Sequence, residues 1–302
     1  MVAKPMKRRQ LLRYSLVLLA GCTAARNNPI GTAFNSTSES FSEQLRFTVT
    51  DIQDFEKLQQ DYRALQTVLA EILHKSIELV AFESYMATAA ALQLAQVELA
   101  LTGASEYVVI HARTNAVPVI GITRPNYRSI ICVSENSKIK SIAQLKGKTI
   151  AMWKVGSTSG HLGVTKLLMD AGLDPKSDLK IMMLGSLGLP ALQKGEVDAW
   201  GGSSTRYEEF LLNSGLSEKV LPPIAKGQQL PCDLLVASSQ LDSISIKEVH
   251  ERLIKNSDRL IQSLSSVEQG KYKKANLVQV NNSDYDTIRH VYKALGQGDF
   301  IP

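Results

Sequence analysis

Three consecutive hydroxyl residues, Ser157, Thr158 and Ser159, lie between two glycines and could bind an oxyanion. Their segment, MWKVGSTSGHLG at 152–163, ends a predicted strand and opens a predicted helix. The first turn of a helix has unpaired backbone N–H groups and a partial positive charge, so hydroxyls there can donate to an anion together with those amides. N-capping is the alternative, but it requires one hydroxyl and not three.

Two catalytic or nucleotide-binding uses of such a turn do not fit. The centre of GSTSG is Thr158, where a nucleophile elbow has serine. A P-loop needs a glycine followed by lysine, but His161 stands at that glycine and no lysine follows. His161 lies two residues into the predicted helix, where it could reach the ligand or face solvent.

The elements that must position these residues alternate between strands and helices. Short apolar runs predict strands at 45–50, 77–82, 97–103, 117–123, 129–134, 148–153, 179–184, 197–202 and 233–238. Helical spacing predicts helices at 54–73, 85–96, from the hydroxyl segment to Ala171, 248–264 and 284–295. Such alternation is typical of buried, largely parallel sheets covered by helices, and it predicts two α/β lobes.

The N-terminus predicts export and a lipid anchor. Residues 1–21 combine a basic start with an apolar run that is far shorter than the ~20 residues of a membrane span, so they read as a signal peptide. LAGC at 19–22 resembles the bacterial lipobox, in which Cys22 is lipidated. RRQLLR at 8–13 also resembles a twin-arginine signal, and the export route stays open. The polar residues 22–43 are expected to form a tether.

The charge balance removes a motive for binding nucleic acid. The signal holds five of the 34 Lys and Arg residues and no acid, so the mature chain has 29 basic residues against 29 Asp and Glu. We therefore expect no nucleic-acid partner. Cys132 and Cys232 both lie in strand-like runs, SIICVS and CDLLVAS, and either a disulfide or two free thiols would fit.

The STSG segment resembles the signature of PhnD-like substrate-binding proteins, which serve ABC importers of phosphonate, phosphite and phosphate. The similarity runs from about Leu45 to Asp242. IAQLKGKTIA at 142–151 and ALQKGEVDAW at 191–200 resemble the type II periplasmic-binding fold of that superfamily. The resemblance implies two lobes of mixed, mostly parallel sheets joined by two hinge strands, with lobe 1 at 44–134 plus 236–302 and lobe 2 at 135–235.

The resemblance also implies a set of ligand-binding residues. Beside the three hydroxyls it points to Tyr85 and Thr102 in the first lobe. Some members have an aromatic residue at the position of Thr102. Asp233 matches an acidic residue at the return to the first lobe. Ser203 could add a contact, and His161 stays a candidate. An Asp233 carboxylate facing the ligand would favour phosphorus oxyanions, which can carry a proton to share, over fully ionised sulfate.

One departure from the family concerns the ligand's substituent. Members that take aminoalkyl phosphonates carry a glutamate soon after the VDA strand, whereas this chain has GGSST at 201–205. Thr205 and Glu208 fit a capping box instead. A small ligand without an amine is therefore expected, such as phosphate, phosphite or methylphosphonate.

These observations predict a monomeric, lipid-anchored binding protein at the outer face of the cytoplasmic membrane. Its expected partners are the oxyanion, an ABC permease and its ATPase. No catalytic arrangement of histidines or metal-ligand cluster occurs in the sequence, so we expect neither an enzyme nor a cofactor or metal. The alternatives are a sensor subunit for a membrane signalling partner, or an importer component for a different small anion.

Overall fold

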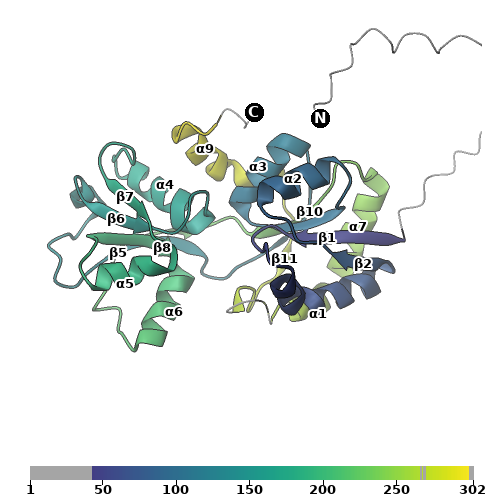
Figure 1. Ribbon diagram of the computed structural model, residues 1–302, viewed down its shortest axis with the longest axis horizontal. Coiled ribbons are helices and arrows are strands. Elements are labelled where there is room, and N and C mark those ends of the chain that lie inside the picture. The colour runs from purple at the N-terminus through teal and green to yellow at the C-terminus, as the bar shows by residue number, and fades with distance from the viewer. Residues whose placement is uncertain (1–42, 266, 268–269, 299–302) are drawn as a thin grey trace, which may run out of the picture. The chain divides into compact units, whose positions relative to one another are not determined.

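Two mixed β-sheets organise the chain, and each is covered by helices on both faces (Figure 1). The computed structural model describes residues 43–265, 267 and 270–298, and from Phe41 onward the chain is one compact unit. The first sheet has the order β11-β4-β10-β3-β1-β2 and the second β7-β6-β8-β5-β9. The strands of the first sheet are β1 (Gln44–Val49), β2 (Ser76–Leu79), β3 (Leu99–Thr102), β4 (Val117–Ile122), β10 (Asp233–Ala237) and β11 (Leu277–Val278). Those of the second are β5 (Arg128–Val133), β6 (Thr149–Met152), β7 (Lys180–Met183), β8 (Ala199–Ser203) and β9 (Pro223–Gln229).

Helices separate most of the strands. The α-helices are α1 (Phe55–Leu73), α2 (Tyr85–Gln93), α3 (Ala104–Thr114), α4 (Gly163–Asp170), α5 (Gly188–Gln193), α6 (Ser204–Ser214), α7 (Ser243–Lys255), α8 (Ser257–Ser263) and α9 (Asp286–Ala294). Shorter helical turns are η1 (Ile142–Leu145), η2 (Thr158–Leu162), η3 (Gly185–Leu187) and η5 (Asn282–Tyr285). The predicted helix 248–264 is interrupted at Asn256, which separates α7 from α8. No helix among the described residues is long and apolar enough to cross a membrane.

Strand direction is mostly parallel within each sheet, as predicted. In the first sheet β2, β1, β3 and β4 run one way, and β10 is inserted antiparallel between β3 and β4. In the second sheet β5 is inserted antiparallel between β8 and β9 in the same manner. Each sheet thus receives an antiparallel strand directly after the chain has crossed from the other sheet. The predicted two-lobed α/β class with mixed sheets is confirmed.

The first crossing lies earlier than predicted. β5 pairs with β8 and β9 in the second sheet, so the chain leaves the first sheet between Ile122 and Arg128 rather than near Ser134. It returns between Gln229 and Asp233, close to the predicted position. β5 is as apolar as the strands of the first sheet, and its composition could not reveal which sheet it joins.

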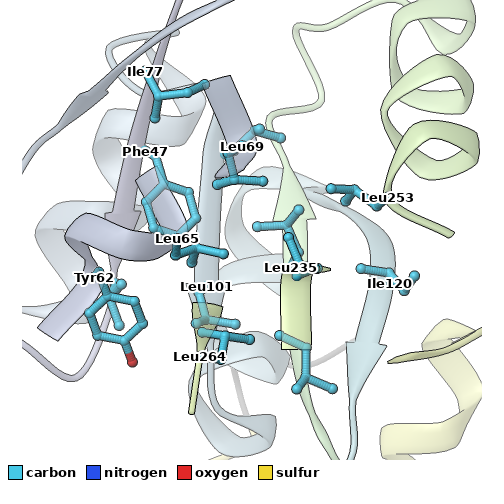
Figure 2. Packing of buried hydrophobic residues seen from close by; sticks show 14 of the residues in the cluster. Phe47, Tyr62, Leu65, Leu69, Ile77, Leu101, Ile120, Leu235, Leu253 and Leu264 are labelled. Atoms are coloured by element: carbon cyan, nitrogen blue, oxygen red, sulfur yellow. The ribbon is translucent and has the colours of Figure 1, made fainter. Parts of the chain in front are cut away.

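The core of the first sheet shows why its elements form. On α1, buried residues recur every three or four positions at Leu58, Tyr62, Leu65 and Leu69, so one stripe of the helix packs on the sheet. Figure 2 shows Leu65 and Leu69 of this stripe beside Phe47 and other residues of the strands. The opposite face is covered by α2, α3 and α9. Helices packed on both faces of the sheet thereby fix the positions of the strand ends that carry the polar residues.

Some predictions concern residues that the structure does not describe, and some helices and strands of the structure were not predicted. The signal peptide 1–21, the lipobox with Cys22 and all of the tether 22–43 except its last residue are outside the described residues. Cys132 and Cys232 are free thiols. The strand β9 and the helices α3, α5 and α6 were not among the predicted elements. The predicted helix from the hydroxyl segment begins with a π-helical turn, η2, and ends at Asp170, just before its predicted last residue.

Candidate functional site

A cavity of about 300 Å³ lies where strands of the two sheets end. Asp51 and Gly103 follow β1 and β3, Trp153 and Lys154 follow β6, and Asp233 begins the antiparallel strand β10. Ligands of open α/β sheets bind outside the carboxyl ends of parallel strands, which is the edge that these residues occupy. The remaining lining residues are Ser105, Glu106, Arg124, Tyr127, Ser157, Thr158, Arg206 and Lys271.

Two helix N-termini meet at this cavity. Ser157 caps its own helical turn, because its Oγ accepts a hydrogen bond from Gly160 N at 3.2 Å. Thr158 Oγ1 accepts from Ser105 N at 3.1 Å, in the first turn of α3, and donates to Ser105 Oγ at 2.9 Å. The N-cap position of α3 is Gly103, which has no side chain to cap the helix. Thr158 therefore caps α3 from the second sheet, and both positive helix ends face the cavity.

The two glycines around the hydroxyls have separate steric reasons. Gly156 has φ +80°, a left-handed conformation that residues with a Cβ rarely adopt. At Gly160 a Cβ would lie 2.4 Å from Trp153 Cβ, so only glycine allows the turn to pack against the end of β6. The glycines shape the turn that presents Ser157 and Thr158.

Ser159 and His161 are buried beside the cavity and do not line it. The Ser159 carbonyl accepts from Ser129 Oγ at 2.7 Å, whereas its own hydroxyl has no partner among the described residues. His161 Nδ1 accepts from Gly156 N at 3.2 Å, and burial lowers the pKa of the imidazole, which favours the neutral ring. The expectation of a solvent-facing histidine was wrong, because His161 instead braces the glycine turn.

Asp233 is fully buried and has three partners, two of them within 3 Å and the third in a longer ion pair. Its Oδ2 lies 2.9 Å from Lys271 Nζ and accepts from the Tyr272 hydroxyl at 2.9 Å, while Oδ1 lies 3.6 Å from an Arg124 nitrogen. Burial alone would raise the pKa of Asp233, but Lys271 and Arg124 lower it below its ordinary value. Asp233 is thus an ionised carboxylate whose charge is balanced by Lys271 and Arg124, and it does not present an unpaired charge to the ligand.

Lys271 joins Asp233 to a second acid. Its Nζ lies 3.1 Å from Asp51 Oδ2. Burial would lower the pKa of the Lys271 ammonium, but Asp233 and Asp51 together raise it well above its ordinary value. The ammonium therefore stays charged in this site.

Glu106 is the third acid of the cavity and, unlike Asp51 and Asp233, it does not pair with Lys271. Its Oε2 accepts from Thr50 Oγ1 at 2.5 Å and from Gly103 N at 3.4 Å. Burial, and then the charge of Asp51, raise the pKa of this carboxyl. The Thr102 hydroxyl lies 3.1 Å from Thr50 Oγ1, so Thr102 supports this arrangement from behind.

Replacing Glu106 with glutamine is expected to change how stability depends on pH. The folded protein holds the Glu106 proton to a higher pH than the unfolded chain, so its stabilising contribution is full below the unfolded pKa and is lost as pH rises through the folded pKa. Denaturation of the wild type and Glu106→Gln between about pH 4 and 8 should show a decline in the wild type that the variant lacks. Parallel pH profiles would show that Glu106 titrates normally.

Two arginines of the cavity are stacked on aromatic rings. The Arg124 guanidinium lies 3.6 Å from the centroid of the Tyr127 ring, and that of Arg206 lies 4.0 Å from the Trp153 ring. Stacking uses the flat face of a guanidinium, whereas its edge of N–H groups is the part that binds an anion. With Lys154 and Lys271 these residues set four basic groups against three acids around the cavity.

The comparisons with known proteins agree with this architecture. The family described as ABC transporter, phosphonate, periplasmic substrate-binding protein matches residues 47–285. The chain belongs to this family. It is therefore a periplasmic substrate-binding protein of an ABC importer of the phosphonate or sulfonate type, and its family is one of transporter components rather than enzymes.

Two curated relatives show where the similarity lies. A putative aliphatic sulfonates-binding protein of Escherichia coli is 32% identical over 127 residues, which is 42% of this chain and 39% of that protein. The phosphate-import protein PhnD of Mycolicibacterium smegmatis is 21% identical over 309 residues, covering 93% of this chain and 94% of that protein. Sulfonate and phosphorus binders are thus both among the relatives.

Solved structures support the fold. PhnD1 of Prochlorococcus marinus in complex with methylphosphonate has a TM-score of 0.65 at 18% identity, covering 84% of this chain and 99% of that one. The sulphonate-binding protein SsuA of Escherichia coli has a TM-score of 0.59 at 21% identity, covering 87% and 89% of the two chains. At these identities the likeness is one of fold.

Within this family fold, only some of the predicted ligand residues reach the cavity. Ser157, Thr158 and Asp233 line it. Tyr85 packs with the apolar cluster of α2, α3 and α9, and Ser203 caps α6 by accepting from Arg206 N at 3.2 Å. Thr102, Ser159 and His161 lie behind the lining.

The charged lining residues were missed at the sequence level. Asp51, Trp153 and Lys154 directly follow strands, and the strand-end rule alone could have found them. Arg124 and Tyr127 lie on the crossing between the sheets, where ligands of two-lobed folds meet the chain. Lys271 lies between α8 and β11, where neither a strand nor a helix period indicates a role.

Proposed function

We propose that this protein captures a small phosphorus oxyanion, such as phosphate, phosphite or a phosphonate, at the cavity between its two sheets. In this proposal Cys22 carries a lipid, the mature chain is a monomer at the outer face of the cytoplasmic membrane, and a permease with its ATPase receives the ligand.

The observation that carries the proposal is the junction of Thr158 and Ser105. It brings the N-terminus of α3 and the N-terminus of the η2–α4 helix to one cavity that also holds Arg124, Lys154 and Arg206. Helix N-termini and guanidinium edges are the groups that bind oxyanions most readily. Backbone and hydroxyl donors on two sides suit a tetrahedral anion.

The acid that would make the site prefer phosphorus oxyanions over sulfur oxyanions is Glu106 and not Asp233. Because Asp233 is neutralised by Lys271 and Arg124, its charge does not require a protonated ligand. Glu106 lines the cavity without a salt bridge among the described residues, so its carboxylate can face an oxyanion only when one proton lies between them, and burial favours holding such a proton. A P–OH group can supply that proton, whereas a sulfonate has none to supply.

The test is thermal unfolding and calorimetry of the mature domain with phosphate, phosphite, methylphosphonate, methanesulfonate and sulfate. Ligand at 100 times Kd should add about 2.7 kcal/mol of stability. Ser157→Ala combined with Thr158→Val should weaken binding by about a hundredfold, because the change removes the Ser157 hydroxyl and the Thr158 contact that holds the N-terminus of α3 at the cavity. Thr67→Val, an exposed threonine of α1, is the matched control.

Each outcome assigns the ligand class. Binding of a phosphorus oxyanion that the double variant loses and Thr67→Val retains would support the proposal. Binding of methanesulfonate alone would establish an importer component for a different small anion, in line with the sulfonate-binding relative. For the anchor, Cys22→Ala should release the protein from the membrane fraction, and retention there would contradict lipidation.

A further inference from the structure

The ammonium of Lys271 lies between two carboxylates at the wall of the cavity. Its Nζ is 2.9 Å from Asp233 Oδ2 and 3.1 Å from Asp51 Oδ2, and the Lys271 side chain is 18% exposed. Hydrogen bonds from an ammonium to carboxylates are charge-assisted and strong, so two converging carboxylates could bind a ligand ammonium in this way. Here a side chain of the protein itself fills that position.

We propose that Lys271 determines specificity by filling a place between Asp51 and Asp233 that could otherwise bind the amine of an aminoalkyl ligand. The cavity then accepts phosphorus oxyanions with hydrogen, hydroxyl or alkyl substituents and rejects those that carry an ammonium. This inference rests on the proposed function, because it concerns the substituent of the same oxyanion.

The carboxylate cluster is within reach of a ligand. A Cβ built on Gly103 would lie 3.9 Å from Asp233 Oδ1 and 3.5 Å from Glu106 Oε2, so the missing side chain leaves this corner accessible from the α3 N-terminus. Asp51, Asp233 and Lys271 all line the cavity. A ligand bound at Thr158 and Ser105 would therefore extend its substituent toward these charges.

The charges at this corner oppose a second ammonium. Asp233 already pairs with Lys271 and Arg124 and accepts from the Tyr272 hydroxyl, and Asp51 pairs with Lys271. An incoming ammonium would find no unpaired carboxylate there and would face the like charges of Lys271 and Arg124. Like-charge contacts of this kind are an effective way to reject a wrong ligand.

Removal of the Lys271 side chain would also create space. Lys271 and Asp51 line a second cavity of about 320 Å³, which borders α1, as well as the first. The side chain thus separates two hollows. Without it, an aminoalkyl chain could enter between Asp51 and Asp233.

Glu106 does not substitute for these acids. Its Oε2 already accepts from Thr50 and Gly103, and burial raises its pKa whereas that of Asp233 is lowered, so Glu106 is a poorer counter-ion for an ammonium than Asp233. Selectivity against amines therefore depends on Lys271.

The wild-type experiment uses a matched pair of ligands. Titration calorimetry with n-propylphosphonate and 2-aminoethylphosphonate compares a methyl with an ammonium at the same position, and methylphosphonate and phosphate serve as references. We expect at least about a tenfold preference for the propyl ligand. Equal or stronger binding of 2-aminoethylphosphonate would overturn the inference and leave the proposed function standing. Failure of all phosphorus oxyanions to bind would overturn the proposed function itself.

The variant experiment separates selectivity from folding. Lys271→Met should bind 2-aminoethylphosphonate at least about tenfold more tightly than the wild type does, because Asp51 and Asp233 then lack their ammonium. Lys271→Met/Asp233→Asn removes both charges of the pair and should not show this gain. Lys273→Met, an exposed lysine two residues away, should behave as the wild type.

A purely structural role of Lys271 would give a different pattern. It would weaken all ligands together in Lys271→Met and restore them together in the double variant, without any change in the ratio of the matched pair, and this result would overturn the inference. If Lys271→Met does not fold, Lys271→Gln keeps a donor to Asp233 without the charge, and the same ratio decides.

Discussion

Replacing Asp233 with alanine is expected to lower the free energy of unfolding by about 3–5 kcal/mol. The carboxylate is 2% exposed and neutralises Lys271 and Arg124, whose side chains are 18% and 15% exposed. Removing one partner of a buried ion pair leaves the other charge desolvated without compensation, which costs more than the pair itself contributed. The Tyr272 hydroxyl would lose its acceptor in the same change. Urea denaturation at neutral pH measures the effect.

Two companion variants identify the cause. Asp170→Ala removes an exposed acid that pairs with Lys166 on the surface of α4, and it should cost less than about 1 kcal/mol. Asp233→Ala/Lys271→Met should recover part of the loss, because it removes one stranded cation together with the acid. A cost of Asp233→Ala near that of Asp170→Ala would show that the buried network contributes little.

The same network gives stability a direction in acid. Burial opposes ionisation of Asp233, but Lys271 and Arg124 hold its pKa below the ordinary value. Its contribution is therefore present above the unfolded pKa and is lost as pH falls through the lower folded pKa. The Glu106 pKa is shifted in the opposite direction, so its contribution to stability is lost as pH rises, whereas that of Asp233 is lost as pH falls.

The elements that hold the cavity could be predicted because their patterns are local. β6 is a short apolar run, and α1 repeats apolar residues at helical spacing, so each period was visible without knowledge of the fold. The hydroxyls were found for the same reason, since Ser157 and Thr158 follow a strand and begin a helix. What those hydroxyls contact was not visible, because Ser105 is distant in sequence.

The charged half of the site could not be predicted from local patterns. Lys271, Asp51 and Asp233 lie in three separate parts of the chain and come together only in the folded protein. Asp233 was identified by family resemblance, but its charge state depends on partners that no spacing reveals. The argument for phosphorus selectivity therefore moved from Asp233 to Glu106 once the ion pairs were known.

Gly201 and Gly202 lie within β8, and the packing around them explains why both are glycine. A Cβ on Gly201 would lie 2.5 Å from Val164 Cγ1, and one on Gly202 would lie 2.1 Å from Trp200 Cζ2. A glutamate at either position could not fit without moving α4 or the Trp200 ring. The absence of an acid at these two positions is therefore part of how β8 packs.

Replacing Gly202 with alanine is expected to lower the free energy of unfolding by about 2–3 kcal/mol, near the upper end of the range for an overpacked core. The added Cβ would meet two carbons of the Trp200 ring at 2.1 and 2.3 Å, and Trp200 is only 2% exposed in the core of the second sheet. Gly227→Ala in β9 of the same sheet is the matched control, because its Cβ would come no closer than 3.3 Å to any atom.

A double-mutant cycle with Trp200→Leu tests whether the ring is the cause. If the clash with the indole destabilises Gly202→Ala, the same change in a Trp200→Leu background should cost at least about 1 kcal/mol less, since the smaller side chain leaves room for the Cβ. Urea denaturation of the four proteins measures the coupling. An equal cost in both backgrounds would place the strain in the β8 backbone, and Gly202 would then be required by the strand rather than by the indole that covers it.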